Sequence, residues 1–330
     1  MTASHQPLDL TNYYSGDRMT STTITAAEAS LKANGRTFHW ARRFLGDEMG
    51  QNAAQLYQFC RLLDDLADGD LPHGAERLTA LRDHLNNGAV LNDRELAGFM
   101  PFIERHHLPL DVILSLIDGL IMDQDVVALQ TQDELVRYGY HVAGTVGLLM
   151  CHILNCQDQE AYPFAIDLGI AMQLTNIARD IREDAEMGRR YLPAEWISSL
   201  SADDIKSAAM NPDQNQDQIN TIRGGVQHLL GLAEVYYNSA IHGLNYLPLR
   251  AHIAILIAAR GYRQIGVQLA RRGSPWYLGR PVTSTSTKAV TSLTALPFMA
   301  KRLGVIPPHH AELHRPLAGL PLANMPPQTS

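Results

Sequence analysis

Long hydrophobic runs are missing from the sequence. The most apolar piece, residues 253–259, is far shorter than the roughly 18 residues that a membrane-spanning helix needs. Residues 1–17 are polar and lack the charged and then apolar pattern of a secretory signal. Cysteine is scarce too, since the chain has only three and they form no disulfide-like framework. We therefore expect a cytoplasmic protein that is soluble or peripheral to the inner face of the membrane.

Positive charge is also limited. The sequence has 27 Lys and Arg against 34 Asp and Glu, and it contains no basic block and no zinc-finger spacing. These absences argue against a nucleic-acid partner. An anionic ligand would have to be held by metal ions or by a few local arginines.

Strand-like alternation and internal repeats are absent, and helical periodicity is what remains. We predict an all-α protein with a single domain over residues 1–330, a core at about 25–300 and an irregular, proline-rich tail at 305–330. The polar segment 198–220 is expected to be rich in loops. Helices are predicted at 25–45 with an interruption near Asn34, and at 51–67, 75–86, 93–105, 110–128, 133–155, between Pro163 and Pro193, 221–245 and 249–272.

One predicted helix carries a polar stripe beside an apolar one. On a helix, residues Gln173, Asn176, Asp180 and Asp184 fall within roughly 80° of one another. Asp180 and Asp184 repel each other at this spacing, so a cationic group is expected between them. Gly169 continues the stripe one turn earlier, where we expect it to leave room for a bulky group.

A second helix repeats this arrangement. Tyr57, Arg61, Asp64 and Asp68 lie within about 60° of one another, with Asp65 at the margin. Carboxylate oxygens suit magnesium, which commonly reaches a protein through one or two carboxylates and the phosphates of a substrate. Two such helices facing each other predict a magnesium–diphosphate site.

Other segments allow two interpretations. The turn at 35–38, which contains Arg36 and Thr37, is either purely structural or a ligand contact. The glycines of 139–147 indicate either a bent helix along a cavity or tight helix packing. Arg260, in an apolar stretch, either meets a phosphate or extends to the surface. Three carboxylates near the end of the 110–128 helix, Asp118, Asp123 and Asp125, are expected to be solvated.

Several separated motifs resemble the squalene/phytoene synthase family of head-to-head prenyl synthases, in the order in which that family has them. The likeness spans about residues 25–300 and includes both aspartate motifs. Gly35 and Arg36 stand where the family often has serine and lysine. The motifs are Gly35-Arg36-Thr37-Phe38, Phe59 to Asp68, Val142 to Gly147, Leu174 to Asp184 and Gly188-Arg189-Arg190-Tyr191-Leu192-Pro193.

The resemblance implies an all-α isoprenoid-synthase fold around a central cavity, and it implies residue roles. Asp64, Asp68, Asp180 and Asp184 would be ligands of magnesium, or of manganese in its place. Tyr138 would offer an aromatic face to a carbocation, and Tyr57 would line the site or belong to the core. The residues implied around the diphosphates are Arg36, Thr37, Arg61, Gln173, Asn176, Arg179, Tyr191 and Arg260.

The family condenses two identical allylic diphosphates through a cyclopropylcarbinyl diphosphate. Likeness to its bacterial carotenoid branch favours geranylgeranyl diphosphate as substrate, phytoene as product, no NADPH, and product release into a membrane surface. Farnesyl diphosphate, giving squalene or dehydrosqualene, is the alternative within the family. Other readings of the aspartates are a terpene cyclase, a head-to-tail elongase or a non-catalytic assembly factor of the same fold.

Overall fold

The computed structural model describes residues 41–156, 158–279 and 306–323. Within these ranges the protein is all-α, with one isolated bridge between Ala128 and Arg190 and no β-strand. No described helix is both long enough and apolar enough to cross a membrane. The helices are α3 (Asp47–Ala67), α4 (Gly74–Asn87), α5 (Arg94–Ala97), α6 (Met100–Arg105), α7 (Leu110–Met122), α8 (Gln132–Gly139), α9 (Thr145–Ile153), α10 (Tyr162–Glu186), α11 (Ala202–Met210), α12 (Gln216–Gly243) and α13 (Leu249–Arg271).

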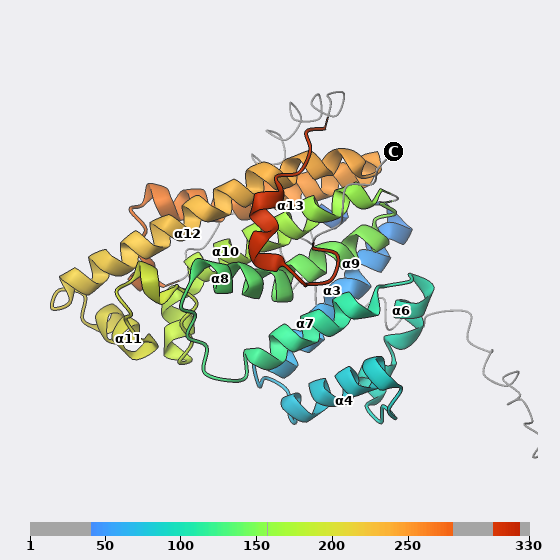
Figure 1. Ribbon diagram of the computed structural model, residues 1–330, viewed down its shortest axis with the longest axis horizontal. Coiled ribbons are helices and arrows are strands. Elements are labelled where there is room, and N and C mark those ends of the chain that lie inside the picture. The colour runs from blue at the N-terminus through green and yellow to red at the C-terminus, as the bar shows by residue number, and fades with distance from the viewer. Residues whose placement is uncertain (1–40, 157, 280–305, 324–330) are drawn as a thin grey trace, which may run out of the picture.

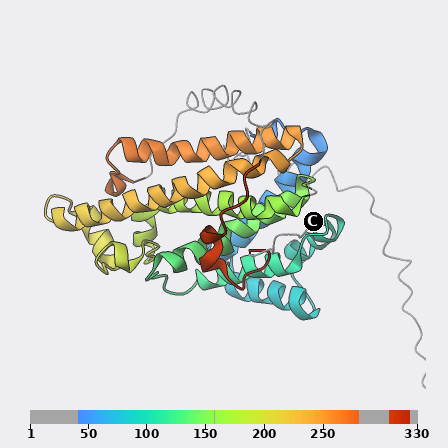
Figure 2. The ribbon, with the colours of Figure 1, turned by 45° about the horizontal axis from the view of Figure 1, so that its top comes forward.

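Helix α10 lies at the centre of the fold. It packs against α9, α11, α12 and α13, and Figures 1 and 2 show it running beside the long helices α12 and α13. Apolar residues recur along it at the spacing that fills a helix face, and Ile170, Leu174 and Ile177 are at most 2% exposed. The predicted second aspartate motif is therefore carried by the central helix of the fold.

Glycines allow α10 to approach the preceding helical segment very closely. A Cβ on Gly169 would lie 2.2 Å from the Ala143 carbonyl oxygen, and one on Gly147 would lie 2.2 Å from the Ala165 carbonyl oxygen. Gly169 therefore leaves no room for a bulky group, contrary to our expectation, because the neighbouring backbone fills that space. Of the two interpretations of 139–147, tight helix packing is the one these contacts support.

A π-helical turn interrupts this segment. Residues Tyr140–Gly144 form η1, which joins α8 to α9 and widens the helix by one residue per turn. Helix α8 begins at a conventional cap, since the Thr131 side chain accepts a hydrogen bond from the Glu134 amide.

Several predicted boundaries differ from the structure. The helix expected at 93–105 is two short helices, α5 and α6, and the one expected at 110–128 ends at Met122. The expected loop at 198–220 contains α11, because Ser201 and Asp204 form a capping box that starts it. The 25–45 helix lies almost wholly outside the described residues.

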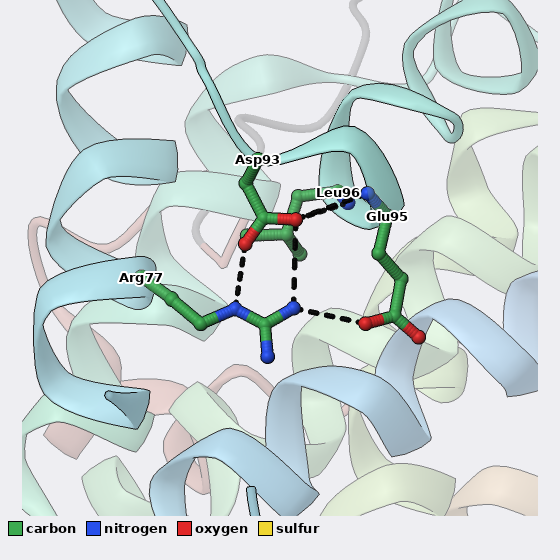
Figure 3. A network of polar contacts seen from close by, with 4 residues as sticks. All are labelled: Arg77, Asp93, Glu95 and Leu96. Carbon is green, nitrogen blue, oxygen red and sulfur yellow. Dashed lines mark hydrogen bonds and ion pairs between the residues drawn. The ribbon is translucent and has the colours of Figure 1, made fainter. Parts of the chain in front are cut away.

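Helix α5 begins at a charged cap (Figure 3). The Asp93 carboxylate accepts hydrogen bonds from the Glu95 and Leu96 amides and from Arg77 Nε of α4, the last at 2.6 Å. Arg77 also reaches Glu95 at 2.9 Å. These contacts tie the short helix to α4.

The expected irregular tail is ordered over residues 306–323. Residues Ala311–Leu317 form the 3₁₀ segment η7, which packs against α8 and appears in red in Figure 1. Side chains of the helices donate to its backbone carbonyls: Arg137 to Pro316, Tyr236 to Leu313 and Tyr140 to Pro321. The prediction of an irregular tail rested on its high proline content. Proline removes backbone hydrogen bonds within the segment, but side chains of other helices supply hydrogen bonds in their place.

Candidate active site

The first aspartate motif lies at the end of α3. Burial raises the pKa of Asp64 to about 7, with Asp68, Asp65 and Asp123 adding to the shift and Arg61 opposing it. Arg61 forms an ion pair with Asp65 at 2.5 Å, one helical turn away. Its Nε atom is buried and has no hydrogen-bond partner. A second cationic group near Asp64 would favour the ionised carboxylate.

The turn that follows α10 returns to this motif. Gly188, with a φ of +77°, reverses the chain, and Arg189 Nη1 then contacts the Asp68 carboxylate at 2.8 Å. The next residue, Arg190, points elsewhere and donates to the Leu129 and Leu192 carbonyls. Thus one arginine of the pair serves the carboxylates and the other fixes the turn.

Asp123, at the end of α7, is part of this site although we expected it to be solvated. It is 8% exposed and accepts hydrogen bonds from the hydroxyls of Tyr138 at 2.8 Å and Tyr191 at 3.1 Å. The two tyrosine rings stack, with centroids 4.8 Å apart. Burial raises the pKa of Asp123 to about 6, against the effect of the Tyr138 hydrogen bond and Arg189. No helical periodicity links Asp123 to the other carboxylates, so no signal in the sequence identified it.

The second aspartate motif lies near the end of α10. Arg179 holds the adjacent Asp180 carboxylate with two hydrogen bonds, from Nε at 2.7 Å and from a terminal nitrogen at 2.5 Å. The cationic group expected between Asp180 and Asp184 is thus in part the neighbouring arginine. Asp184 is half-buried and interacts electrostatically with Tyr191.

Two further polar residues of this stripe face each other. Asn176 Nδ2 donates to Gln173 Oε1 at 3.4 Å, while Asn176 Oδ1 is buried without a hydrogen-bond partner. On α3, Gln58 Oε1 is also buried without a hydrogen-bond partner. Such orphaned atoms are costly unless something binds there.

Tyrosines from α3 and α13 connect the two motifs. The pKa of Tyr57 is raised to about 12 by burial, then by Tyr262 and the nearby carboxylates. Burial also raises the pKa of Tyr262, which interacts with Arg179 and Asp180. Tyr57 therefore belongs beside the charged groups, and Tyr262 is a residue to which the sequence assigned no role.

Arg260 lies on α13, two residues before Tyr262, and lines a hollow with Leu168, Tyr237 and Arg263. Its role beside the diphosphates stays a prediction. Arg36 and Thr37 lie outside the described residues.

The donors fit a divalent ion with an anionic ligand. Carboxylates supply hard oxygen ligands, and the buried Arg61 Nε is a free donor for an anion. The four aspartates do not form a compact cage. Among the described residues, only Asp167, His309 and His314 bring three His, Cys, Asp or Glu ligand atoms within 4.8 Å of one another.

Comparison with known proteins agrees with this reading of the motifs. The squalene/phytoene synthase family matches residues 31–288, which include both aspartate motifs. The chain belongs to the squalene/phytoene synthase family. Relatives include the 15-cis-phytoene synthases of Enterobacter agglomerans, 33% identical over 80% of this chain and 92% of the relative, and of Pantoea ananas, 33% identical over 89% and 98%.

Solved structures of similar fold come from the same family. A dehydrosqualene synthase has a TM-score of 0.72 and 24% identity, over 85% of this chain and 97% of that one. A squalene synthase from Alicyclobacillus acidocaldarius has a TM-score of 0.63 and 22% identity, over 76% and 94%. These similarities establish the all-α isoprenoid-synthase fold.

Proposed function

We propose that the protein is a phytoene synthase, a prenyltransferase that joins two geranylgeranyl diphosphates head to head through a cyclopropylcarbinyl diphosphate. The observation that supports this most is that the 188–193 turn, which follows the second aspartate motif, meets the first motif through the Arg189–Asp68 contact and Asp123 through the Tyr191–Asp123 contact. Phytoene synthases are also prominent among its relatives.

In this proposal Asp64, Asp68, Asp180 and Asp184 hold magnesium, or manganese in its place. A bound divalent ion would act as a Lewis acid on the leaving diphosphate. Arg61 directs its unpaired Nε at a diphosphate oxygen, and Asn176 and Gln173 orient the groups bound there. Arg179 and Arg189 already neutralise Asp180 and Asp68, so they keep the carboxylates together before a ligand arrives.

The tyrosines serve the organic part of the substrate. Asp123 fixes the hydroxyls of Tyr138 and Tyr191 and thereby the orientation of their stacked rings. An aromatic face held in this way stabilises a nearby carbocation. Two protons are lost, one as the cyclopropane closes and one as the final cation forms a double bond. The two departing diphosphates take them, so two substrates give one hydrocarbon and two protonated diphosphates. No hydride is needed, so the proposal includes no NADPH.

The deciding experiment is product analysis with purified protein. Geranylgeranyl and farnesyl diphosphates are supplied separately, each with and without magnesium and NADPH. We expect phytoene from geranylgeranyl diphosphate with magnesium alone. Reaction of farnesyl diphosphate only would move the assignment to squalene or dehydrosqualene synthesis, and no turnover of either would favour an assembly factor.

The proposed location is the cytoplasm, with peripheral contact to a membrane that receives the product. Three exposed apolar side chains support this contact: Met122 at 61%, Val126 at 88% and Met187 at 56%. They belong to the two segments that the Arg190 amide joins by donating to the Val127 carbonyl at 2.8 Å. These segments also carry Asp123 and Arg189 of the site.

A further inference from the structure

A second group of ionisable side chains lies away from the aspartate motifs. Asp167 of α10 is fully buried, and His314 and His309 of the 306–323 segment are 2% and 12% exposed. Asp167 precedes Asp180 by 13 residues, which places it about 20 Å along the helix and on the opposite side. We call Asp167, His309 and His314 the C-terminal triad.

His314 is surrounded by hydrogen-bond acceptors. Its Nδ1 atom lies 2.8 Å from the Ala323 carbonyl oxygen and its Nε2 atom lies 2.8 Å from Asp167 Oδ1. A neutral imidazole has one N–H, which can satisfy only one of these neighbours. When Nδ1–H donates to Ala323, the Nε2 lone pair faces a carboxylate. Either a second proton on His314 or a metal ion must therefore lie between His314 and Asp167.

The second histidine converges on the same carboxylate. His309 Nε2 lies 2.8 Å from Asp167 Oδ2, and the two imidazole rings are 4.4 Å apart. The Ser239 hydroxyl of α12 donates to Asp167 Oδ2 at 2.5 Å. The Asp167 carboxylate is therefore approached by two imidazole nitrogens and one hydroxyl group.

We propose that the C-terminal triad binds a divalent transition-metal ion of the zinc class, which fastens residues 306–323 to α10. Two imidazole nitrogens and one carboxylate oxygen are a donor set for zinc, whereas magnesium prefers oxygen ligands only. A proton can bridge only one histidine nitrogen and one carboxylate oxygen. A metal ion can bind all three ligand atoms, which already lie within 4.8 Å of one another. Water completes the coordination.

The surroundings of the triad are those of a metal ligand set. Metal-binding histidines commonly donate their other ring nitrogen to a backbone carbonyl, as His314 does to Ala323. Ligating carboxylates are in turn hydrogen-bonded, as Asp167 is by Ser239. The role is structural, because the triad is buried and the ion would join two segments 142 residues apart in the chain.

The test measures metal bound to the full-length, tag-free protein after dialysis against a weak chelator. We expect one zinc ion per chain by elemental analysis and, after exchange, visible absorption from bound cobalt. Zinc should raise the Tm of the stripped protein, and magnesium at the same concentration should not, since a ligand stabilises the state that binds it.

Variants locate the ion. His309→Ala and His314→Ala should each weaken zinc binding by at least about a hundredfold. The control is His310→Ala, because this neighbouring histidine is exposed and is not in the triad; it should bind like the wild type. Asp64→Asn should also keep its zinc, which separates this site from the proposed magnesium site.

Metal-free protein whose Tm does not respond to zinc would overturn the proposal, and a proton shared by His314 and Asp167 would then hold the segment. Zinc retained in both triad variants would overturn it as well. If these variants fail to fold, metal content and the cobalt spectrum of the wild type still decide the question.

Discussion

Asp64 and Asp180 occupy opposite electrostatic surroundings although both belong to aspartate motifs. Burial and three other carboxylates raise the pKa of Asp64 to about 7, whereas Arg179 grips Asp180 with two hydrogen bonds. We predict that Asp64→Asn and Asp180→Asn each lower kcat at least about a hundredfold, because each removes a proposed metal ligand.

Stability should separate these two variants. At pH 8, Asp64→Asn should raise the Tm of metal-free protein, since it removes a poorly solvated charge. Asp180→Asn should lower it, since it leaves Arg179 without its carboxylate. Steady-state kinetics with excess magnesium and thermal unfolding measure both effects. Near-normal turnover in either variant would contradict the ligand assignment.

Asp123 gives a prediction about pH. Its pKa rises from 3.8 to about 6 on folding, so the folded protein binds the extra proton between these values. The contribution of this group to stability is present below about pH 4 and is lost, by about 3 kcal/mol, as the pH rises through 6. Asp123→Asn has no carboxyl group to titrate, so its free energy of unfolding should not fall in this way. In urea unfolding from pH 4 to 8, the stability of the variant relative to the wild type should therefore increase with pH. A stability difference that stays constant over this range would refute the shift.

The sequence identified most of the candidate site because helical spacing places residues on one face. Gln173, Asn176 and Asp180 could be grouped in this way, as could the residues of α3. Spacing could not reveal Asp123 and Tyr262, because each reaches the site from a different helix through tertiary packing. Nor could it show that Arg61 pairs with Asp65.

At the scale of elements, the sequence predicted the long helices better than the short ones. Helices α10, α12 and α13 have sustained apolar periodicity, whereas α5 and α11 depend on the local caps Asp93 and Ser201. The ordered 306–323 segment was missed because side chains of distant helices, Arg137, Tyr140 and Tyr236, donate hydrogen bonds to its carbonyl groups. Periodicity in one segment contains no information about such partners.

The close approach of α10 to η1 and α9 gives an element-scale prediction. Gly169→Ala should lower the free energy of unfolding by about 3 kcal/mol, since its methyl group would lie 2.2 Å from a backbone oxygen. Gly224→Ala is the matched control, because this helical glycine in α12 has no atom within 4 Å of its would-be Cβ. The free energy of unfolding of Gly224→Ala should rise by about 0.5–1 kcal/mol, because alanine favours a helix more than glycine does. Equal effects in chemical denaturation would contradict the packing argument.

For the whole molecule, we propose that residues 1–330 form one domain, because α10 packs against elements from both halves of the chain. The apolar side chains Met122, Val126 and Met187 then define one face of that domain near the site. A hydrocarbon product would leave through such a face, since each buried CH₂ favours lipid by about 0.8 kcal/mol.

We predict that Val126→Asp combined with Met187→Asp reduces vesicle binding and slows product release severalfold, while single-turnover chemistry is retained. Val90→Asp is the control, because Val90 is 81% exposed but lies in the loop between α4 and α5. Flotation with anionic vesicles and multiple-turnover assays with and without lipid provide the measurements. If lipid does not change the rate of product release in the wild type or in either variant, the proposed membrane-binding face is wrong.

The π-helical turn at Tyr140–Gly144 sets a limit on evolutionary change in the length of the chain. Residues before it direct Tyr138 to Asp123, and residues after it direct Gly147 to the backbone of α10. Deleting one residue within the turn would rotate everything beyond it by about 100° relative to α8. A side chain would then replace Gly147 against Ala165. Insertions and deletions in this turn should therefore be selected against as strongly as the loss of an aspartate.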